Sequence, residues 1–125
     1  LSNGLHTRFL SHDGEVIQAY QNDALVHGKL SARLLNSMLQ AMEYAHDHAP
    51  QLNIPVLLLV AEDDHLVDPV GSKRFSARLA PAISTAIYYE GFYHEIFNEL
   101  EAVRVFDDLH AWLEHQHFIA PVAAH

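Results

Sequence analysis

The sequence predicts an α/β fold in which parallel strands alternate with helices, and three segments lead to this prediction. Residues 54–60 form a short run of Ile, Pro, Val and Leu, which is typical of a central strand buried on both faces of a parallel sheet. Residues 84–90 are rich in Thr, Ile and Tyr and predict a second strand. The segment between them, residues 70–79, is amphipathic and predicts the crossover helix that joins two parallel strands.

The first part of the chain has little regular pattern. Asn3-Gly4 and Asp13-Gly14 favour turns, and only residues 15–20 have the spacing of a short helix. We therefore distinguish residues 1–29 from residues 30–125. No linker in the sequence divides the two parts into independent domains.

The longest predicted helix covers residues 30–48. Ser31 is its expected N-cap, and Pro50 ends it. Apolar residues recur at spacings of three and four and form one stripe, which consists of Leu34, Leu35, Met38, Leu39, Met42 and Ala45. We expect this stripe to pack in the core, with lipid contact as the alternative.

Two more helices are expected after the first strand. Asp68 precedes Pro69, so its carboxylate is expected to cap the helix of residues 70–79, which Pro81 terminates. The last helix covers residues 99–117, and the tail at residues 120–125 is expected to fray. The inner face of this helix should consist of Val103, Phe106, Leu109, Trp112 and Leu113, and its outer face of Glu101, Arg104, Asp107, Asp108 and Glu114.

Composition excludes several classes of function. A chain of 125 residues with 50% hydrophobic residues can form one domain with a core. A net charge of −9 argues against a nucleic-acid partner. The absence of cysteine excludes disulfides and thiolate metal sites and is compatible with a cytoplasmic location. No apolar run approaches the roughly 20 residues that span a bilayer, and the first residues do not resemble a signal peptide.

Polar residues follow both predicted strands where each strand ends. Asp63 and Asp64 come after the first strand, and His94 follows the second strand and Gly91. Parallel neighbours end at the same edge of a sheet, where ligands and catalytic groups gather, so we expect Asp64 and His94 to meet. Such a pair is the acid and base part of a catalytic triad. The alternative is that these residues are only solvated loop residues.

The same residues carry a resemblance to the α/β-hydrolases. Residues 20–27 (YQNDALVH), 54–59 (IPVLLL) and 89–95 (YEGFYHE) resemble the monoacylglycerol lipase and lysophospholipase branch, which is grouped with the serine aminopeptidases. The similarity extends from about Leu10 to Leu113. It implies that residues 30–125 are the C-terminal part of an α/β-hydrolase core and residues 1–29 part of a helical cap. It also implies a lipid-like ester substrate, peripheral membrane contact and no cofactor.

Individual residues can be matched to the family pattern. Asp64 matches the catalytic acid and His94 the catalytic base, while Leu66 and Val67 fall beside the expected acyl pocket. Ala61 stands where the family usually has Gly, which leaves Asp63 open as an alternative acid. Because fold does not determine reaction, peptidase and haloalkane chemistry also stay open.

The family's nucleophile has no match in this chain. Its Ser lies in a G-x-S-x-G turn that precedes the Asp and His. The five glycines (Gly4, Gly14, Gly28, Gly71 and Gly91) are never four positions apart, and the chain starts at Leu1. We expect the chain to be the downstream part of a longer protein, whose N-terminal portion would supply the Ser. The alternative is a non-catalytic truncated fragment or interaction module.

Eleven histidines raise the question of a metal site. Residues 94–98 (HEIFN) begin like the zinc motif H-E-x-x-H, but Asn98 replaces the second ligand. Two further His pairs, at 46 and 48 and at 115 and 117, are two residues apart on predicted helices and point to different faces. We therefore expect no metal.

Overall fold

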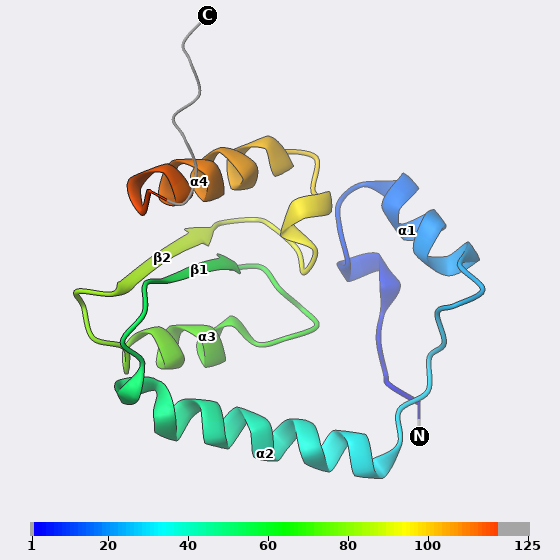
Figure 1. The fold of residues 1–125 in the computed structure, drawn as a ribbon. Coiled ribbons are helices and arrows are strands. Elements are labelled where there is room, and N and C mark those ends of the chain that lie inside the picture. Colours follow the sequence, from blue (N-terminus) through cyan, green and yellow to red (C-terminus); the bar gives the residue numbers. More distant parts are fainter. Residues whose placement is uncertain (1, 118–125) are drawn as a thin grey trace, which may run out of the picture.

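The fold is a small three-layer arrangement around two parallel strands (Figure 1). The computed structural model describes residues 2–117, and the predicted frayed tail lies outside them. Strands β1 (Val56–Ala61) and β2 (Ser84–Tyr89) are joined by helix α3 (Pro69–Ser76). Helix α4 (Ala102–His115) covers one face of the sheet, and α3 covers the other, with the long helix α2 (Ala32–His48) beyond it. The predicted α/β fold is confirmed.

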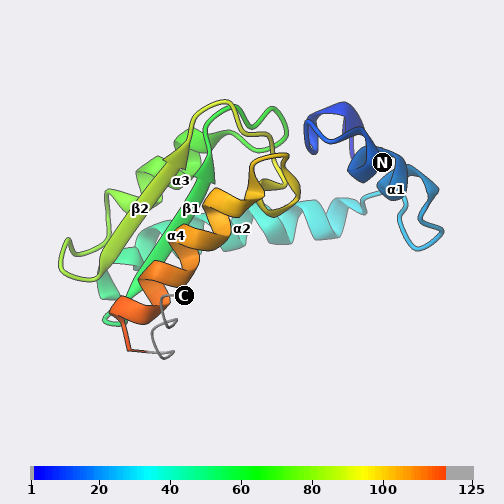
Figure 2. The same cartoon turned by 90° about the horizontal axis from the view of Figure 1, so that it is seen from above.

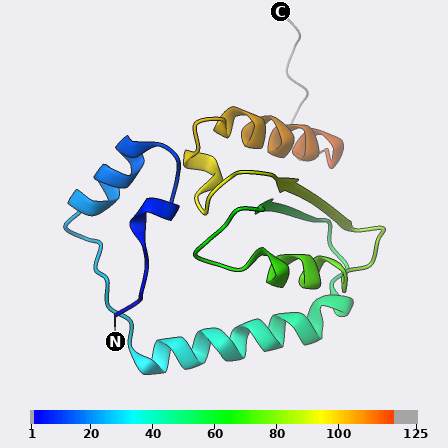
Figure 3. The same cartoon turned by 180° about the vertical axis from the view of Figure 1, so that it is seen from behind.

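The N-terminal segment lies beside the carboxyl ends of the strands (Figures 1 and 3). It contains a short 3₁₀ helix, η1 (Thr7–Phe9), and helix α1 (Gly14–Asn22), while η2 (Ala49–Gln51) and η3 (Ile96–Asn98) are single turns elsewhere. Viewed from above, α1 is displaced from the sheet and α4 crosses over it (Figure 2). No helix within residues 2–117 is both long and apolar enough to cross a membrane.

The two strands pair in register from Val56 opposite Ser84 to Ala61 opposite Tyr89. Within residues 2–117, β1 has no second strand partner, so the expected central position of β1 is wrong for this chain. Its residues 56–59 are half-buried and only Val60 and Ala61 are buried, because one edge of β1 has no neighbouring strand.

Capping residues set where the helices begin. Asp68 accepts a hydrogen bond from the backbone N–H of Val70, and Ser31 accepts one from Leu34, both at the helix starts that the sequence predicts. Asp13 caps α1 in the same way. The last helix starts at Ala102 rather than at residue 99, so Glu99 lies in the preceding loop.

The core lies between the sheet and α4. It consists of Ala61, Tyr89, Phe92, Ile96 and Val105. The predicted inner face of the last helix is partly wrong, because Val103 and Phe106 are exposed and Asp108 is half-buried. The reason is that α4 faces the sheet with Val105, which is fully buried, and with Asp108, which accepts a hydrogen bond of 2.8 Å from the hydroxyl of Tyr89.

The apolar stripe of α2 is exposed. No residue of α2 is buried, and the Leu and Met side chains of the stripe keep 39–59% of their surface in solvent. The expectation of core packing is therefore wrong for the described residues. Helix α3 packs against α2, but most of the stripe stays in contact with solvent.

Candidate active site

The loop after β1 places Asp64 at the edge of the sheet. Backbone hydrogen bonds between the two segments continue past the end of β1. The N–H of Glu62 donates to the carbonyl of Tyr89, and the N–H of Asp63 donates to the carbonyl of Phe92. One carboxylate oxygen of Asp64 then accepts two backbone N–H groups, from Leu66 at 2.8 Å and Val67 at 2.9 Å. This turn fixes the direction of the Asp64 side chain.

The loop after β2 brings His94 to the same edge. Gly91 has a φ of +74°, a left-handed conformation that glycine adopts without steric cost, and it turns the chain directly after the strand. Phe92 then enters the core, which anchors the loop. His94 is 38% exposed and stands at the surface next to Asp64.

Asp64 and His94 form a hydrogen-bonded pair. The second carboxylate oxygen of Asp64, Oδ2, lies 2.8 Å from Nδ1 of His94. The side chain of Asp64 is 11% exposed, so the contact is largely shielded from water on the acid's side. Within residues 2–117, Nε2 of His94 has no hydrogen-bond partner, and this nitrogen can exchange a proton with a reacting group.

The environment keeps Asp64 ionised. Burial raises the pKa of the Asp64 carboxyl, but hydrogen bonds from His94 and from the N–H groups of Val67 and Leu66 outweigh this effect, so the net pKa is lowered. An ionised Asp64 holds the proton of His94 on Nδ1 and stabilises the imidazolium that forms when Nε2 takes up a second proton. The geometry thus suits general base and general acid chemistry.

Asp63 and Asp64 point to different partners. Oδ1 of Asp63 lies 3.2 Å from Nε2 of His65, and both of these side chains are about half exposed. The ring of His65 also packs against Phe9, with the ring centroids 4.4 Å apart. Of the two adjacent acids left open by the sequence, Asp64 is the one that contacts His94.

Leu66 and Val67 lie on the same loop, and their backbone N–H groups donate to Asp64. The Val67 side chain is exposed and lines a shallow apolar groove of about 440 Å³ between α2 and α3. Met42, Leu58 and Phe75 also line this groove. Leu66 is half-buried and is not among the groove-lining residues, so the structure does not bring the two predicted substrate contacts together.

Residues 94–98 (HEIFN), which begin like a zinc motif, include the single turn η3. The side-chain amide of Asn98 donates to the carboxylate of Glu95 at 2.8 Å. No group of three His, Asp or Glu side chains with the geometry of a metal site occurs within residues 2–117.

Two residues near the site, His12 and Glu99, are not predicted from the sequence. Glu99 is buried and contacts both His12 and the backbone of Tyr93, next to His94. His12 and Glu99 are 87 residues apart, so no local spacing or motif connects them. A Glu directly before an amphipathic helix normally indicates a helix start, so the sequence pattern places Glu99 in the last helix.

Comparison with solved structures defines the class of protein. The crystal structure of a monoacylglycerol lipase from Paleococcus ferrophilus superposes with a TM-score of 0.84 and 38% identity, over 90% of this chain and 44% of that chain. The two parallel strands and the helices around them match part of that structure. The chain is part of an α/β-hydrolase domain.

The family follows from the sequence comparison. A family model described as serine aminopeptidase, S33, matches residues 1–101, and the chain belongs to this family. A monoacylglycerol lipase of Mycolicibacterium smegmatis is 34% identical over 83% of this chain and 38% of its own length. The phospholipase YtpA of Bacillus subtilis is 33% identical over 91% of this chain and 44% of its own length. The chain thus spans less than half of these relatives.

Proposed function

We propose that this chain supplies the catalytic acid and base of a serine hydrolase that cleaves carboxylic esters of single-chain glycerolipids. The observation that carries the proposal is the 2.8 Å contact between Asp64 and His94 at the carboxyl ends of two parallel strands. The names of two relatives, a monoacylglycerol lipase and a phospholipase, support the lipid substrate.

The chemistry assigns one role to each residue. A Ser outside this chain attacks the ester carbonyl and gives its proton to Nε2 of His94. His94 then returns the proton to the alcohol oxygen as the C–O bond breaks, which leaves an acyl group on the Ser. Water, activated by His94, releases the fatty acid and restores the Ser. Asp64 orients His94 and stabilises its charged form throughout.

The proposed substrate site extends from the pair along the loop after β1. Leu66 and Val67 follow Asp64 directly, and Val67 faces the apolar groove shared with Leu58 and Phe75. An acyl chain contacts such surface favourably because it leaves water. In this proposal Val67 contacts the acyl chain, while Leu66 contributes chiefly through its N–H group to Asp64.

The test compares adjacent acids in the protein that contains this chain together with its nucleophile. We expect Asp64→Asn and His94→Ala to lower kcat for monoacylglycerol hydrolysis by about 10³- to 10⁴-fold. Asp63→Asn is the matched control, because Asp63 contacts His65 instead of His94, and it should change kcat by less than about threefold. Near-normal turnover of Asp64→Asn, or an equal loss in Asp63→Asn, would overturn the assignment.

A second experiment tests whether the 125 residues act alone. The sequence contains no G-x-S-x-G, and no serine hydroxyl within residues 2–117 contacts His94. We therefore expect the chain by itself to resist labelling by a serine-directed fluorophosphonate and to leave p-nitrophenyl esters intact. Stoichiometric labelling of one Ser in this chain would show that the nucleophile is present after all.

A further inference from the structure

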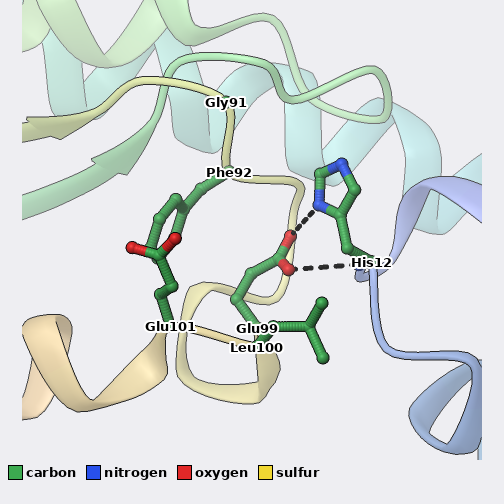
Figure 4. Close-up of a pocket in the computed structure, with 6 residues that line it drawn as sticks. All are labelled: His12, Gly91, Phe92, Glu99, Leu100 and Glu101. Atoms are coloured by element: carbon green, nitrogen blue, oxygen red, sulfur yellow. Dashed lines mark hydrogen bonds and ion pairs between the residues drawn. The ribbon is translucent and has the colours of Figure 1, made fainter.

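Glu99 is a buried charged residue outside the Asp64–His94 pair. Its side chain is 3% exposed and lies between the loop after β2 and the N-terminal segment (Figure 4). Removing a carboxylate from water is costly unless hydrogen-bond donors replace the water. The residues around Glu99 provide three such donors.

The three donors come from two distant parts of the chain. The backbone N–H of His12 donates to Oε2 at 3.1 Å, and Nδ1 of His12 lies 2.9 Å from Oε1. The backbone N–H of Tyr93 donates to Oε1 at 2.7 Å. One carboxylate therefore joins the N-terminal segment to the residue that precedes His94.

The N-terminal segment also binds the backbone of the His94 loop directly. The N–H of His94 donates to the carbonyl of Phe9 at 3.4 Å, and the N–H of Glu95 donates to the carbonyl of Leu10 at 2.8 Å. Three consecutive N–H groups, at positions 93 to 95, are thus held by Glu99 and by residues 9 and 10. The backbone that carries the His94 side chain is held in this way.

Contacts between side chains reinforce the same arrangement. The imidazole of His12 stacks on the ring of Tyr93, with centroids 3.7 Å apart. The hydroxyl of Ser11, itself buried, donates to the carbonyl of Asn98 at 2.7 Å. These contacts bring residues 11 and 12 against the loop that carries Glu99.

The charge of Glu99 is maintained by its donors. Burial raises the pKa of the Glu99 carboxyl, but hydrogen bonds from the N–H of Tyr93 and from the ring and N–H of His12 outweigh it, so the net pKa is lowered. Glu99 is therefore an ionised acceptor at neutral pH, and charged acceptors form the stronger hydrogen bonds.

We propose that Glu99 is a positioning residue that sets the orientation of His94 toward Asp64 by holding the N–H of Tyr93 and tying residues 9–12 to the His94 loop. The importance of this orientation for catalysis rests on the function proposed above. The positioning itself is a property of the chain and can be measured without turnover.

The variants separate positioning from general stability. Glu99→Gln keeps the shape of the side chain but places an NH₂ group against at least one of the three donors. Tyr89→Phe is the control for stability, because it removes only the hydroxyl that bonds Asp108 on α4 and keeps the ring that packs on Phe92. Glu101→Gln is the control for charge, since Glu101 is exposed and pairs only with Arg104 among the described residues.

The experiment records histidine side-chain and backbone amide signals by NMR in the 125-residue chain, well below the unfolding temperature of each variant. In Glu99→Gln, the Nδ1–H signal of His94 should broaden or shift, and the amide of Tyr93 should exchange on the order of tenfold faster. Both controls should retain the signals of the original chain. If Glu99→Gln does not fold, His12→Ala replaces it, with the same expectation for His94.

The outcomes are decisive in either direction. An unchanged His94 signal in a folded Glu99 or His12 variant would overturn the proposal, and so would an equal change in Tyr89→Phe. Because no substrate is used, lack of ester hydrolysis in the whole protein would count against the proposed function and not against this result. A disturbed His94 signal confined to the Glu99 and His12 variants is the expected result.

Discussion

Two carboxylates near the candidate site, Asp64 and Glu99, are held in the same way. Asp64 and Glu99 are both largely removed from solvent, and each binds backbone N–H groups together with Nδ1 of a histidine. Their surroundings differ in one respect that matters for chemistry. His94 and His12 are similarly exposed, at 38% and 40%, but the ring of His12 stacks on Tyr93, whereas Oδ2 of Asp64 holds Nδ1 of His94.

The lowered pKa values of these carboxyls predict how stability depends on pH. A carboxyl whose pKa is lower in the folded state stabilises the fold above its unfolded pKa of about 4, and this contribution is lost as the pH falls through the folded value. We expect the free energy of unfolding to decrease as the pH falls below about 5, with a shallower decrease in Asp64→Asn and Glu99→Gln. Urea unfolding at several pH values measures this.

The control for the pH dependence is Glu101→Gln. Its carboxylate is exposed and pairs with Arg104 on the same helix turn, so removing it should leave the slope against pH as in the original chain. Equal slopes for all four proteins would show that the two buried carboxyls do not have the lowered pKa values described here.

At the scale of elements, helix α4 is oriented by one buried residue. Val105 is fully buried and Val103 is 68% exposed, although both are valines in the first turns of the same helix. Because the intrinsic helix propensity of the Val→Ala change is the same at both positions, their difference reports packing alone.

The pair of alanine substitutions therefore tests the orientation of α4. Val105→Ala should lower the free energy of unfolding by about 2 kcal/mol, because it removes two buried methyl groups and leaves a cavity. Val103→Ala should change it by less than about 0.5 kcal/mol. Denaturant unfolding measures both, and a larger loss at 103 than at 105 would mean that the helix faces the sheet as the sequence pattern suggested.

Tyr89 links strand β2 to α4 through its hydroxyl. The side chain is 1% exposed, and burial, with the bond to Asp108, raises the pKa of its phenol well above the usual range. Tyr89→Phe should cost about 1–2 kcal/mol of unfolding free energy, because Asp108 loses its donor.

Tyr88→Phe is the matched control in the adjacent strand position. Tyr88 faces the opposite side of the sheet, where its ring lies 5.2 Å from the Lys73 ammonium. Removal of its hydroxyl should leave thermal unfolding nearly unchanged. A similar drop in melting temperature for both variants would contradict a specific role for the Tyr89–Asp108 bond.

At the scale of the whole molecule, the exposed stripe of α2 is the main departure from a compact domain. The solved monoacylglycerol lipase matches this chain over only 44% of its own length. In the 125-residue chain, the Leu and Met side chains of the stripe face solvent. This predicts that substituting them has little effect on folding.

Met38→Gln tests the location of the stripe. Met and Gln have similar helix propensities, so this change should alter the free energy of unfolding by less than about 0.5 kcal/mol and reduce the fluorescence of the apolar dye ANS bound to the chain. A loss of about 2 kcal/mol or more would instead place Met38 in a core.

Much of the fold could be predicted from local patterns. The order of the elements follows from signals that act over a few residues. These signals are the caps at Ser31 and Asp68, the breaks at Pro50 and Gly91, and the two apolar strands. The meeting of Asp64 and His94 also follows, because parallel neighbours must end at the same edge.

The remaining features depend on contacts between distant residues. Asp64 rather than Asp63 contacts His94, which lies 30 residues further along the chain. The face that α4 turns to the sheet depends on the burial of Val105 and on the bond between Tyr89 and Asp108. The sequence by itself determined the element order, the helix caps and the meeting of an acid with an imidazole, since these arise from local chain geometry. Only the tertiary structure decided the role of Glu99, because its donors are brought together by folding.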